Sequence, residues 1–201
     1  MTFSKGFTLI EVVIAVSVFS GLIIIVASLL INIMQNPQLQ MAAMDNIDRT
    51  RFVSSQFTNE IRAAAYGSYP LIGAENSEII FYSPVGAGAG NINRIRYYIS
   101  GNNLYKAVIV PVNGIYDISE EVITLVLTGL SNGTDPLFYY YGGDYNGSQS
   151  SVPLSQPVNV NQVKFVKINL IVQKQTTAQD TSSFSLDAGA AIRVLKNNLS
   201  N

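Results

Sequence analysis

The chain of 201 residues contains no cysteine, no histidine and no tryptophan. Without cysteine it has no disulfide framework, and without cysteine and histidine it cannot build the common structural zinc sites. Serine or cysteine nucleophiles that histidine activates are excluded for the same reason. The composition therefore argues against an enzyme, and no cofactor is expected.

Charged residues are also scarce, since they make up 12% of the chain, about half of the fraction in an ordinary soluble domain. The 12 basic and 13 acidic residues leave a formal net charge of −1. A balance this close to zero argues against a protein whose main task is to wrap nucleic acid. The apolar fraction of 48% is too high for a disordered chain, and the length suits one domain with an appended segment.

The apolar residues are concentrated near the N-terminus. The 23 residues from Val12 to Met34 include 18 apolar ones and no charged one. A helix needs about 20 such residues to cross the hydrocarbon core of a bilayer, whereas the apolar part of a cleavable signal peptide has about 7–15. The segment therefore predicts a helical membrane anchor, with a fully buried helix as the alternative.

A single carboxylate, Glu11, stands at the edge of this apolar segment. An unpaired charge inside a membrane costs several kcal/mol, so such residues are candidates for a functional role. The alternative is a structural role, in which Glu11 lies at the membrane surface and interacts with the positive end of the helix dipole.

The residues around Glu11 form a motif. Lys5 to Val12 read Lys-Gly-Phe-Thr-Leu-Ile-Glu-Val and follow a short hydrophilic leader. This motif resembles the class III leader of type IV pilins and type II secretion pseudopilins. The resemblance implies that prepilin peptidase, a membrane-embedded aspartyl peptidase, cuts after Gly6 and N-methylates the new terminus, Phe7. It also implies that, during assembly, the amine of an incoming Phe7 neutralises Glu11 of a neighbouring subunit.

The resemblance carries expectations for partners and location. The implied partners are prepilin peptidase, other pilin or pseudopilin subunits, the inner-membrane assembly platform and the lipid bilayer. The chain is expected to cross the bacterial cytoplasmic membrane once, with its C-terminal domain in the periplasm or at the cell surface, and to enter a pilus or pseudopilus after assembly. Many major pilins have paired C-terminal cysteines, so their absence favours a minor pilin or a pseudopilin. A tip adhesin or a DNA-uptake minor pilin is the alternative.

A weaker resemblance covers the C-terminal part of the chain. The aromatic segment 136–147 and the segments 163–172 and 191–197 look like the tail of larger minor pilins and J-class pseudopilins. In that tail, an aromatic strand and a turn precede two long final strands.

A second helical segment follows the apolar one. Between residues 38 and 65, apolar side chains recur at helical spacing and predict an amphipathic helix that packs on a globular partner. The side chains expected on its apolar face are Leu39, Ala43, Ile47, Phe57, Ile61 and Ala64, with Val53 at the margin. Pro37 removes one backbone donor, so the sequence allows either one helix from Phe7 to about Tyr66 or two helices divided at Pro37.

After Pro70 the apolar pattern changes to a period of two, and β-branched and aromatic residues dominate. This pattern predicts strands at residues 78–83, 94–100, 104–110, 121–127, 137–141, 162–174 and 183–195. For the segment 121–127 a short helix is the alternative. Because the connections are too short for crossover helices, we expect antiparallel meander pairing.

Together these segments predict an α+β, pilin-like fold. A long N-terminal helix, membrane-spanning and then amphipathic, is expected to pack on a mainly antiparallel β-sheet domain. The expected parts are a cleaved leader at 1–6, a transmembrane and polymerisation helix at 7–34, its amphipathic continuation at 35–66 and a β-rich globular domain at 67–201.

Three cations of one expected hairpin, Arg94, Arg96 and Lys106, form a candidate basic patch that would suit DNA uptake. Three scattered cations on a near-neutral domain are more often a solvated sheet face. We therefore do not expect DNA as a partner.

Tyrosines gather before the last two expected strands, at Tyr139, Tyr140, Tyr141 and Tyr145. They fit either adhesion and subunit contact, in which tyrosine is enriched, or packing within a half-buried strand. The segment Asp144–Gly147 is similar to part of a calcium loop but lacks the later glutamate, so a plain turn is favoured and no metal is expected.

Overall fold

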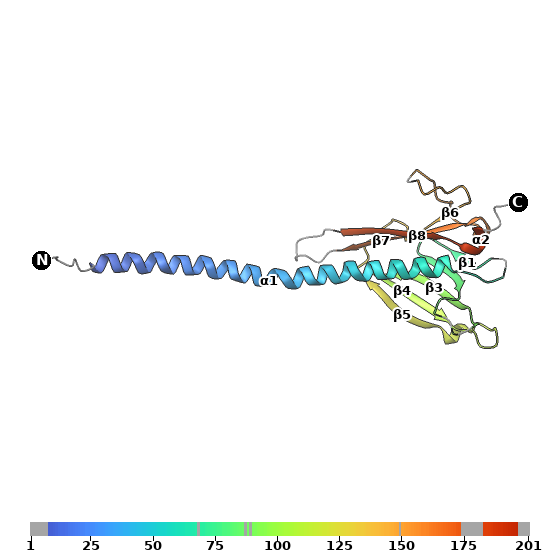
Figure 1. The fold of residues 1–201 in the computed structure, drawn as a ribbon, viewed down its shortest axis with the longest axis horizontal. Coiled ribbons are helices and arrows are strands. Elements are labelled where there is room, and N and C mark those ends of the chain that lie inside the picture. The colour runs from blue at the N-terminus through green and yellow to red at the C-terminus, as the bar shows by residue number, and fades with distance from the viewer. Residues whose placement is uncertain are drawn as a thin grey trace.

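The computed structural model describes residues 8–67, 69–86, 88, 90–148, 150–173 and 183–196, and for residues 32–44 and 196 it describes the backbone alone. α1 is a single helix from Leu9 to Arg62 that continues through Pro37, so the one-helix alternative is confirmed (Figure 1). One missing backbone donor does not outweigh the hydrogen bonds of the flanking turns. The helix ends before Tyr66, and the Ala63 N–H donates to the Asn59 carbonyl at 3.1 Å.

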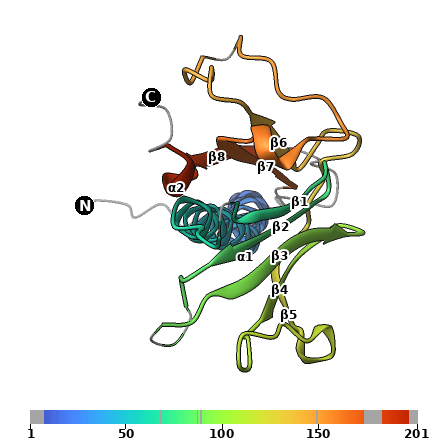
Figure 2. The ribbon, with the colours of Figure 1, turned by 90° about the vertical axis from the view of Figure 1, so that its right-hand side faces the viewer.

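Two antiparallel sheets form the rest of the described domain (Figure 2). The first is a five-stranded meander, in the order β1 (Leu71–Ala74), β2 (Glu78–Ser83), β3 (Asn93–Ser100), β4 (Asn103–Ile109) and β5 (Val122–Thr128). The second has three strands, in the order β6 (Phe138–Tyr141), β7 (Phe165–Gln173) and β8 (Ser183–Ala191). Three short helical elements are η1 (Ile118–Glu120) before β5, η2 (Val160–Gln162) before β7 and α2 (Arg193–Lys196) after β8.

The antiparallel pairing is confirmed, but the meander does not continue from β5 to β6. The chain instead leaves the first sheet after β5 and starts a second one, and an isolated bridge pairs Leu130 with Val172 of β7. The sequence pattern also does not predict β1, a strand of four residues that includes Gly73. A segment this short carries too little alternation to be recognised.

The last two strands are shorter than expected. The strand predicted from residue 162 begins at Phe165, because the preceding residues form η2, where the Asn159 side chain accepts from the Asn161 N–H. The strand predicted to residue 195 ends at Ala191, because the chain turns into α2 and buries Leu195 in the core. In both places a local turn competes with the extended pattern.

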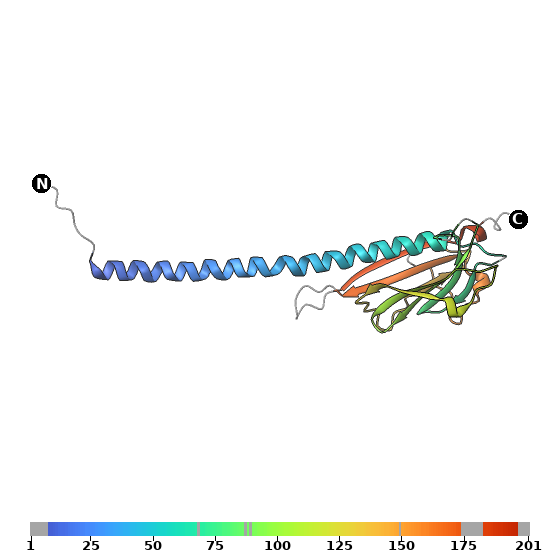
Figure 3. The same ribbon diagram turned by 90° about the horizontal axis from the view of Figure 1, so that it is seen from below.

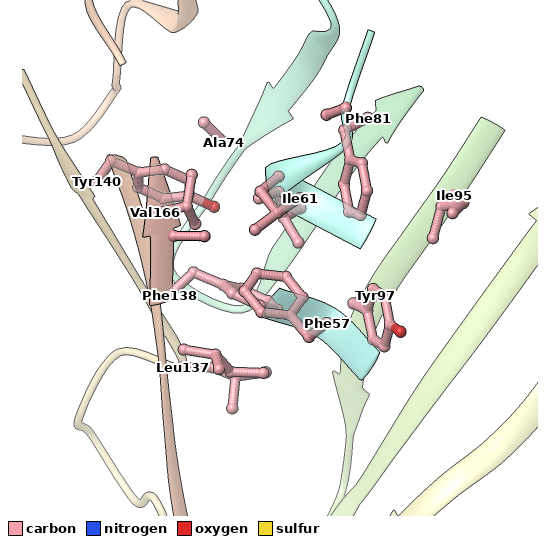
Figure 4. Packing of buried hydrophobic residues seen from close by; sticks show 14 of the residues in the cluster. Phe57, Ile61, Ala74, Phe81, Ile95, Tyr97, Leu137, Phe138, Tyr140 and Val166 are labelled. Atoms are coloured by element: carbon pink, nitrogen blue, oxygen red, sulfur yellow. The ribbon is translucent and has the colours of Figure 1, made fainter. Parts of the chain in front are cut away.

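The C-terminal half of α1 lies between the two sheets (Figure 2), while the N-terminal half extends beyond them (Figure 3). Phe57 is fully buried, and its ring lies between Tyr97 of β3 and Phe138 of β6, at centroid distances of 5.4 and 5.6 Å (Figure 4). Val53 is buried as well, although we expected it at the margin of the apolar face. Because two sheets flank the helix, its buried stripe is wider than the pattern predicts. The predicted α+β fold is confirmed.

Candidate membrane-spanning and assembly helix

The N-terminal half of α1 is an exposed apolar rod. Residues Leu9–Ile31 have a mean hydropathy of 2.8, and none of this segment is buried against the domain. At about 1.5 Å per residue, such a segment crosses the roughly 30 Å of a bilayer core. It is the one such segment that we find in the described part of the chain. A single apolar helix near the N-terminus is typical of a membrane anchor or a signal sequence.

The serine hydroxyls within this segment all find an acceptor on the backbone of the same helix. The hydroxyls of Ser17, Ser20 and Ser28 each donate to a carbonyl of the preceding helical turn at 2.8 Å. In hydrocarbon no water is present to accept these hydrogen bonds, so an internal acceptor is needed. The serines therefore fit an apolar environment in spite of their polarity.

Glu11 forms a capping box with Thr8 at the start of α1. A carboxylate oxygen of Glu11 accepts from the backbone N–H and from the hydroxyl of Thr8, both at 2.9 Å, and the Glu11 N–H donates to the Thr8 hydroxyl at 3.4 Å. The carboxylate thus occupies the first turn, where the helix dipole favours a negative charge. This geometry fits the structural role that the sequence left open, and it keeps the carboxylate exposed to a partner from outside the chain.

The other two site residues that the leader motif predicts, Gly6 and Phe7, lie outside the described residues, as does Lys5. Cleavage after Gly6 and methylation of Phe7 therefore stay predictions.

The domain end of α1 carries a second carboxylate, Glu60, which is 2% exposed. One of its oxygens accepts from the Lys106 ammonium in an ion pair and from the Gln56 amide at 3.1 Å, and the other accepts from the Tyr97 hydroxyl at 2.8 Å. Burial raises the pKa of the Tyr97 hydroxyl far above its ordinary range, and the Glu60 charge raises it further. Tyr97 therefore keeps its proton and remains a donor. The cluster joins α1 to β3 and β4.

The opposite face of the first sheet carries a separate ionic cluster. Arg96 donates to both oxygens of Glu121 and pairs with Glu78 at 3.3 Å, while Arg94 lies 3.9 Å from Glu121. The Arg96 guanidinium also lies over the Tyr98 ring, 4.3 Å from its centroid. The Glu121 hydrogen bonds are the main cause of a raised pKa at Arg96.

The structure does not bring Lys106 together with Arg94 and Arg96, so the candidate basic patch does not form. Lys106 pairs with Tyr97 in the β3–β4 register and therefore points toward α1, whereas Arg94 and Arg96 point to the other face. All three cations are also paired with carboxylates. The spacing of the three cations along the chain gives no information about these acidic partners.

One acidic partner could have been found from helical spacing. Glu60 follows Val53 by seven residues and Phe57 by three, so it shares their buried stripe. A carboxylate on an apolar stripe requires a buried partner. The partnership of Glu121 depends on the loop before β5, which no periodicity describes.

The tyrosines of β6 mainly pack within the domain. Tyr140 is 1% exposed and its hydroxyl donates to the Glu75 carbonyl at 2.7 Å. The Tyr141 ring packs against the tilted ring of Tyr145, with centroids 4.2 Å apart. Tyr139 is half-buried beside the Lys167 ammonium. Strand packing accounts for these contacts, so none of them points to adhesion.

The segment after β6 is an ordinary turn. The Asn146 side chain accepts from the Ser148 N–H at 2.9 Å, which is an Asx turn. Within the described residues we find no group of three or more acidic, cysteine or histidine side chains that could hold a metal ion.

The chain matches no protein-family model and no curated protein.

Proposed function

We propose that the chain is a pilin-like structural subunit that prepilin peptidase processes and that assembles into a type IV pilus or a type II secretion pseudopilus, as a minor component. The observation that supports this most is the division of α1. Its N-terminal half is apolar and uncovered, whereas its C-terminal half lies in the core of the β domain. Because the anchor and the domain share one helix, the apolar half can move from the lipid into a bundle of the same helices from other subunits while the domain stays folded.

The proposed location follows from the same helix. The apolar segment anchors the chain in the bacterial cytoplasmic membrane, and the β domain lies outside the cytoplasm. Lys5 in the leader stays on the cytoplasmic side, in keeping with the bias of basic residues toward that side. The partners in this proposal are prepilin peptidase, related subunits, the assembly platform and the bilayer.

Glu11 has two uses in this proposal. In the membrane it caps α1 through Thr8. During assembly the amine of Phe7 from an incoming subunit approaches the exposed carboxylate and neutralises it. An uncompensated carboxylate in an apolar helical bundle is costly, so the pairing selects one register between subunits.

The experiment that tests the proposal is the mass of the chain purified from membranes of a bacterium that has a prepilin peptidase. We expect a chain that lacks Met1–Gly6 and carries one added methyl group on Phe7. Gly6→Val should retain the full mass, because a side chain at this position obstructs the approach of the peptidase to the backbone. A full-length wild-type chain, in cells that process their own prepilins, contradicts the proposal.

A further inference from the structure

The free edge of the first sheet is β5, at the end of the sheet far from β6–β8 (Figure 2). Among the described strands β5 pairs with β4 alone, so one row of its N–H and C=O groups has no strand partner there. Such an edge is a template for another strand, and proteins normally protect it with charged residues, proline or a covering segment.

β5 has few of these protections. Its residues read Val-Ile-Thr-Leu-Val-Leu-Thr, without a charge or a proline. Val122, Ile123 and Leu125 are 66%, 52% and 45% exposed, so aliphatic side chains stand free on both faces of the strand. One register shift in the pairing with β4 is the only irregularity of the described strand.

The loop before β5 extends this surface. Val112, Ile115 and Ile118 are about two-thirds or more exposed. Val112 and Ile115 pair across a tight turn in which Asn113 and Gly114 have φ of 52° and 78°, a conformation typical of a type I′ turn. The apolar side chains are therefore held in place by a hairpin. We call Val112, Ile115, Ile118, Val122, Ile123 and Leu125 the β5 surface.

The charged residues of the loop before β5 are all acidic, whereas Arg49 and Lys106 lie beside Leu125 on the side toward α1. Asp117 and Glu120 are exposed in the loop before β5, and Glu121 is occupied by Arg96. No basic residue occurs between Val110 and Thr128. A partner that complements this surface therefore combines aliphatic side chains with lysine or arginine.

A second copy of this chain does not have that chemistry. The strands that end a described sheet are β1, β5, β6 and β8, and none of them contains a lysine or an arginine. An antiparallel pair of two β5 strands would place Asp117 and Glu120 of each copy beside the uncharged Thr128 end of the other, so neither carboxylate would meet a cation. We infer that the β5 surface accepts an extended strand of a different protein, in which aliphatic side chains alternate and a basic residue stands at one end or both. The inference does not depend on the proposed pilin-like function.

The test uses the full chain in detergent micelles and fluorescent synthetic peptides. The first peptide alternates valine and threonine and has a lysine at each end. The second has glutamates in place of the lysines, and the third is the lysine peptide with a proline at its centre, which removes a ladder donor. Fluorescence anisotropy gives the dissociation constant of each. We expect the lysine peptide to bind at least about tenfold more tightly than the other two at low salt.

Variants locate the binding. Ile123→Lys places a cation on the free edge and should weaken binding of the lysine peptide by about tenfold or more, and Val122→Lys serves the same purpose if the first variant does not fold. Val152→Lys is the matched control, since Val152 is 86% exposed and lies outside the β5 surface. It should leave the dissociation constant unchanged.

Four results overturn the inference. The first is that the glutamate peptide binds as tightly as the lysine peptide, and the second is that the proline peptide does so. The third is that Ile123→Lys and Val122→Lys bind the lysine peptide as tightly as the wild-type chain does. The fourth is that the wild-type chain dimerises and that Ile123→Lys abolishes the dimer. The last result would assign the β5 surface to a second copy.

Discussion

The Glu60 carboxylate of α1 pairs with the Lys106 ammonium of β4 at a position where the two side chains are 2% and 13% exposed. The pair connects the helix to the first sheet across a site from which water is largely excluded. Removing one member of a buried pair leaves an uncompensated charge, which is more costly than replacing both.

Lys106→Met keeps most of the side-chain volume and removes the ammonium. We expect the free energy of unfolding to fall by about 3–5 kcal/mol, because Glu60 is left charged and buried. Urea unfolding of the full chain in detergent, followed by the near-ultraviolet circular dichroism of its tyrosines, measures the change.

Two further variants test the cause. Adding Glu60→Gln to Lys106→Met removes the buried charge and keeps an acceptor for Tyr97, so most of the loss should be recovered. Arg51→Met breaks an ion pair with Asp48 that is exposed at both ends, and it should change stability by less than about 0.5 kcal/mol. A double variant no more stable than Lys106→Met would show that the loss is due to packing.

Two buried tyrosines predict a loss of stability at alkaline pH. Burial raises the pKa of Tyr97 and of Tyr140 above the ordinary value of about 10. Above that pH the unfolded chain releases these protons while the folded chain retains them, so stability decreases as pH rises. Each group contributes a decrease of about 1.4 kcal/mol per pH unit.

Urea unfolding at a series of alkaline pH values checks this slope. Tyr97→Phe and Tyr140→Phe should each make the decrease less steep, and the double variant should reduce it further. Tyr97→Phe should also lower stability at neutral pH by about 1.5–3 kcal/mol, because Glu60 loses a donor. An equally steep decrease in all variants contradicts the assignment to these two hydroxyls.

Two phenylalanines on α1 differ in burial. Phe57 is fully buried between the sheets, whereas Phe52 is 68% exposed on the same helix. Phe57→Ala should cost about 3–5 kcal/mol of unfolding free energy, since it removes a ring from a packed core. Phe52→Ala should change it by less than about 0.5 kcal/mol. Similar losses in both variants would mean that helix propensity, rather than burial between two sheets, decides the effect.

The sequence predicts the parts of this fold that depend on local periodicity. β2 and the β3–β4 hairpin were predictable because alternation is clear and Gly101, with φ of 59°, marks the turn. The burial of Val53 and the division into two sheets could not be predicted, because both depend on long-range pairing such as the bridge from Leu130 to Val172. The same reason explains why the candidate basic patch does not form, since the side of the sheet on which Lys106 lies follows from register.

The two roles of Glu11, helix cap and assembly partner, are separable by substitution. Glu11→Gln keeps an oxygen that accepts from the Thr8 N–H, so the start of α1 should be retained, but it removes the charge. If the charge pairs with the amine of Phe7, this variant should be cleaved and methylated like the wild type and yet enter filaments at least about tenfold less. The ratio of the chain in sheared filaments to the chain in membranes measures assembly, and its mass measures processing.

Ser17→Ala is the control for this variant, because the Ser17 hydroxyl donates only to the Val13 carbonyl within the same helix. It should assemble like the wild type. If Glu11→Gln also assembles normally, then Glu11 acts as the helix cap alone, and another contact must set the register between subunits. If instead the Glu11 variant escapes cleavage, the carboxylate is required by the peptidase, and the assembly role loses its support.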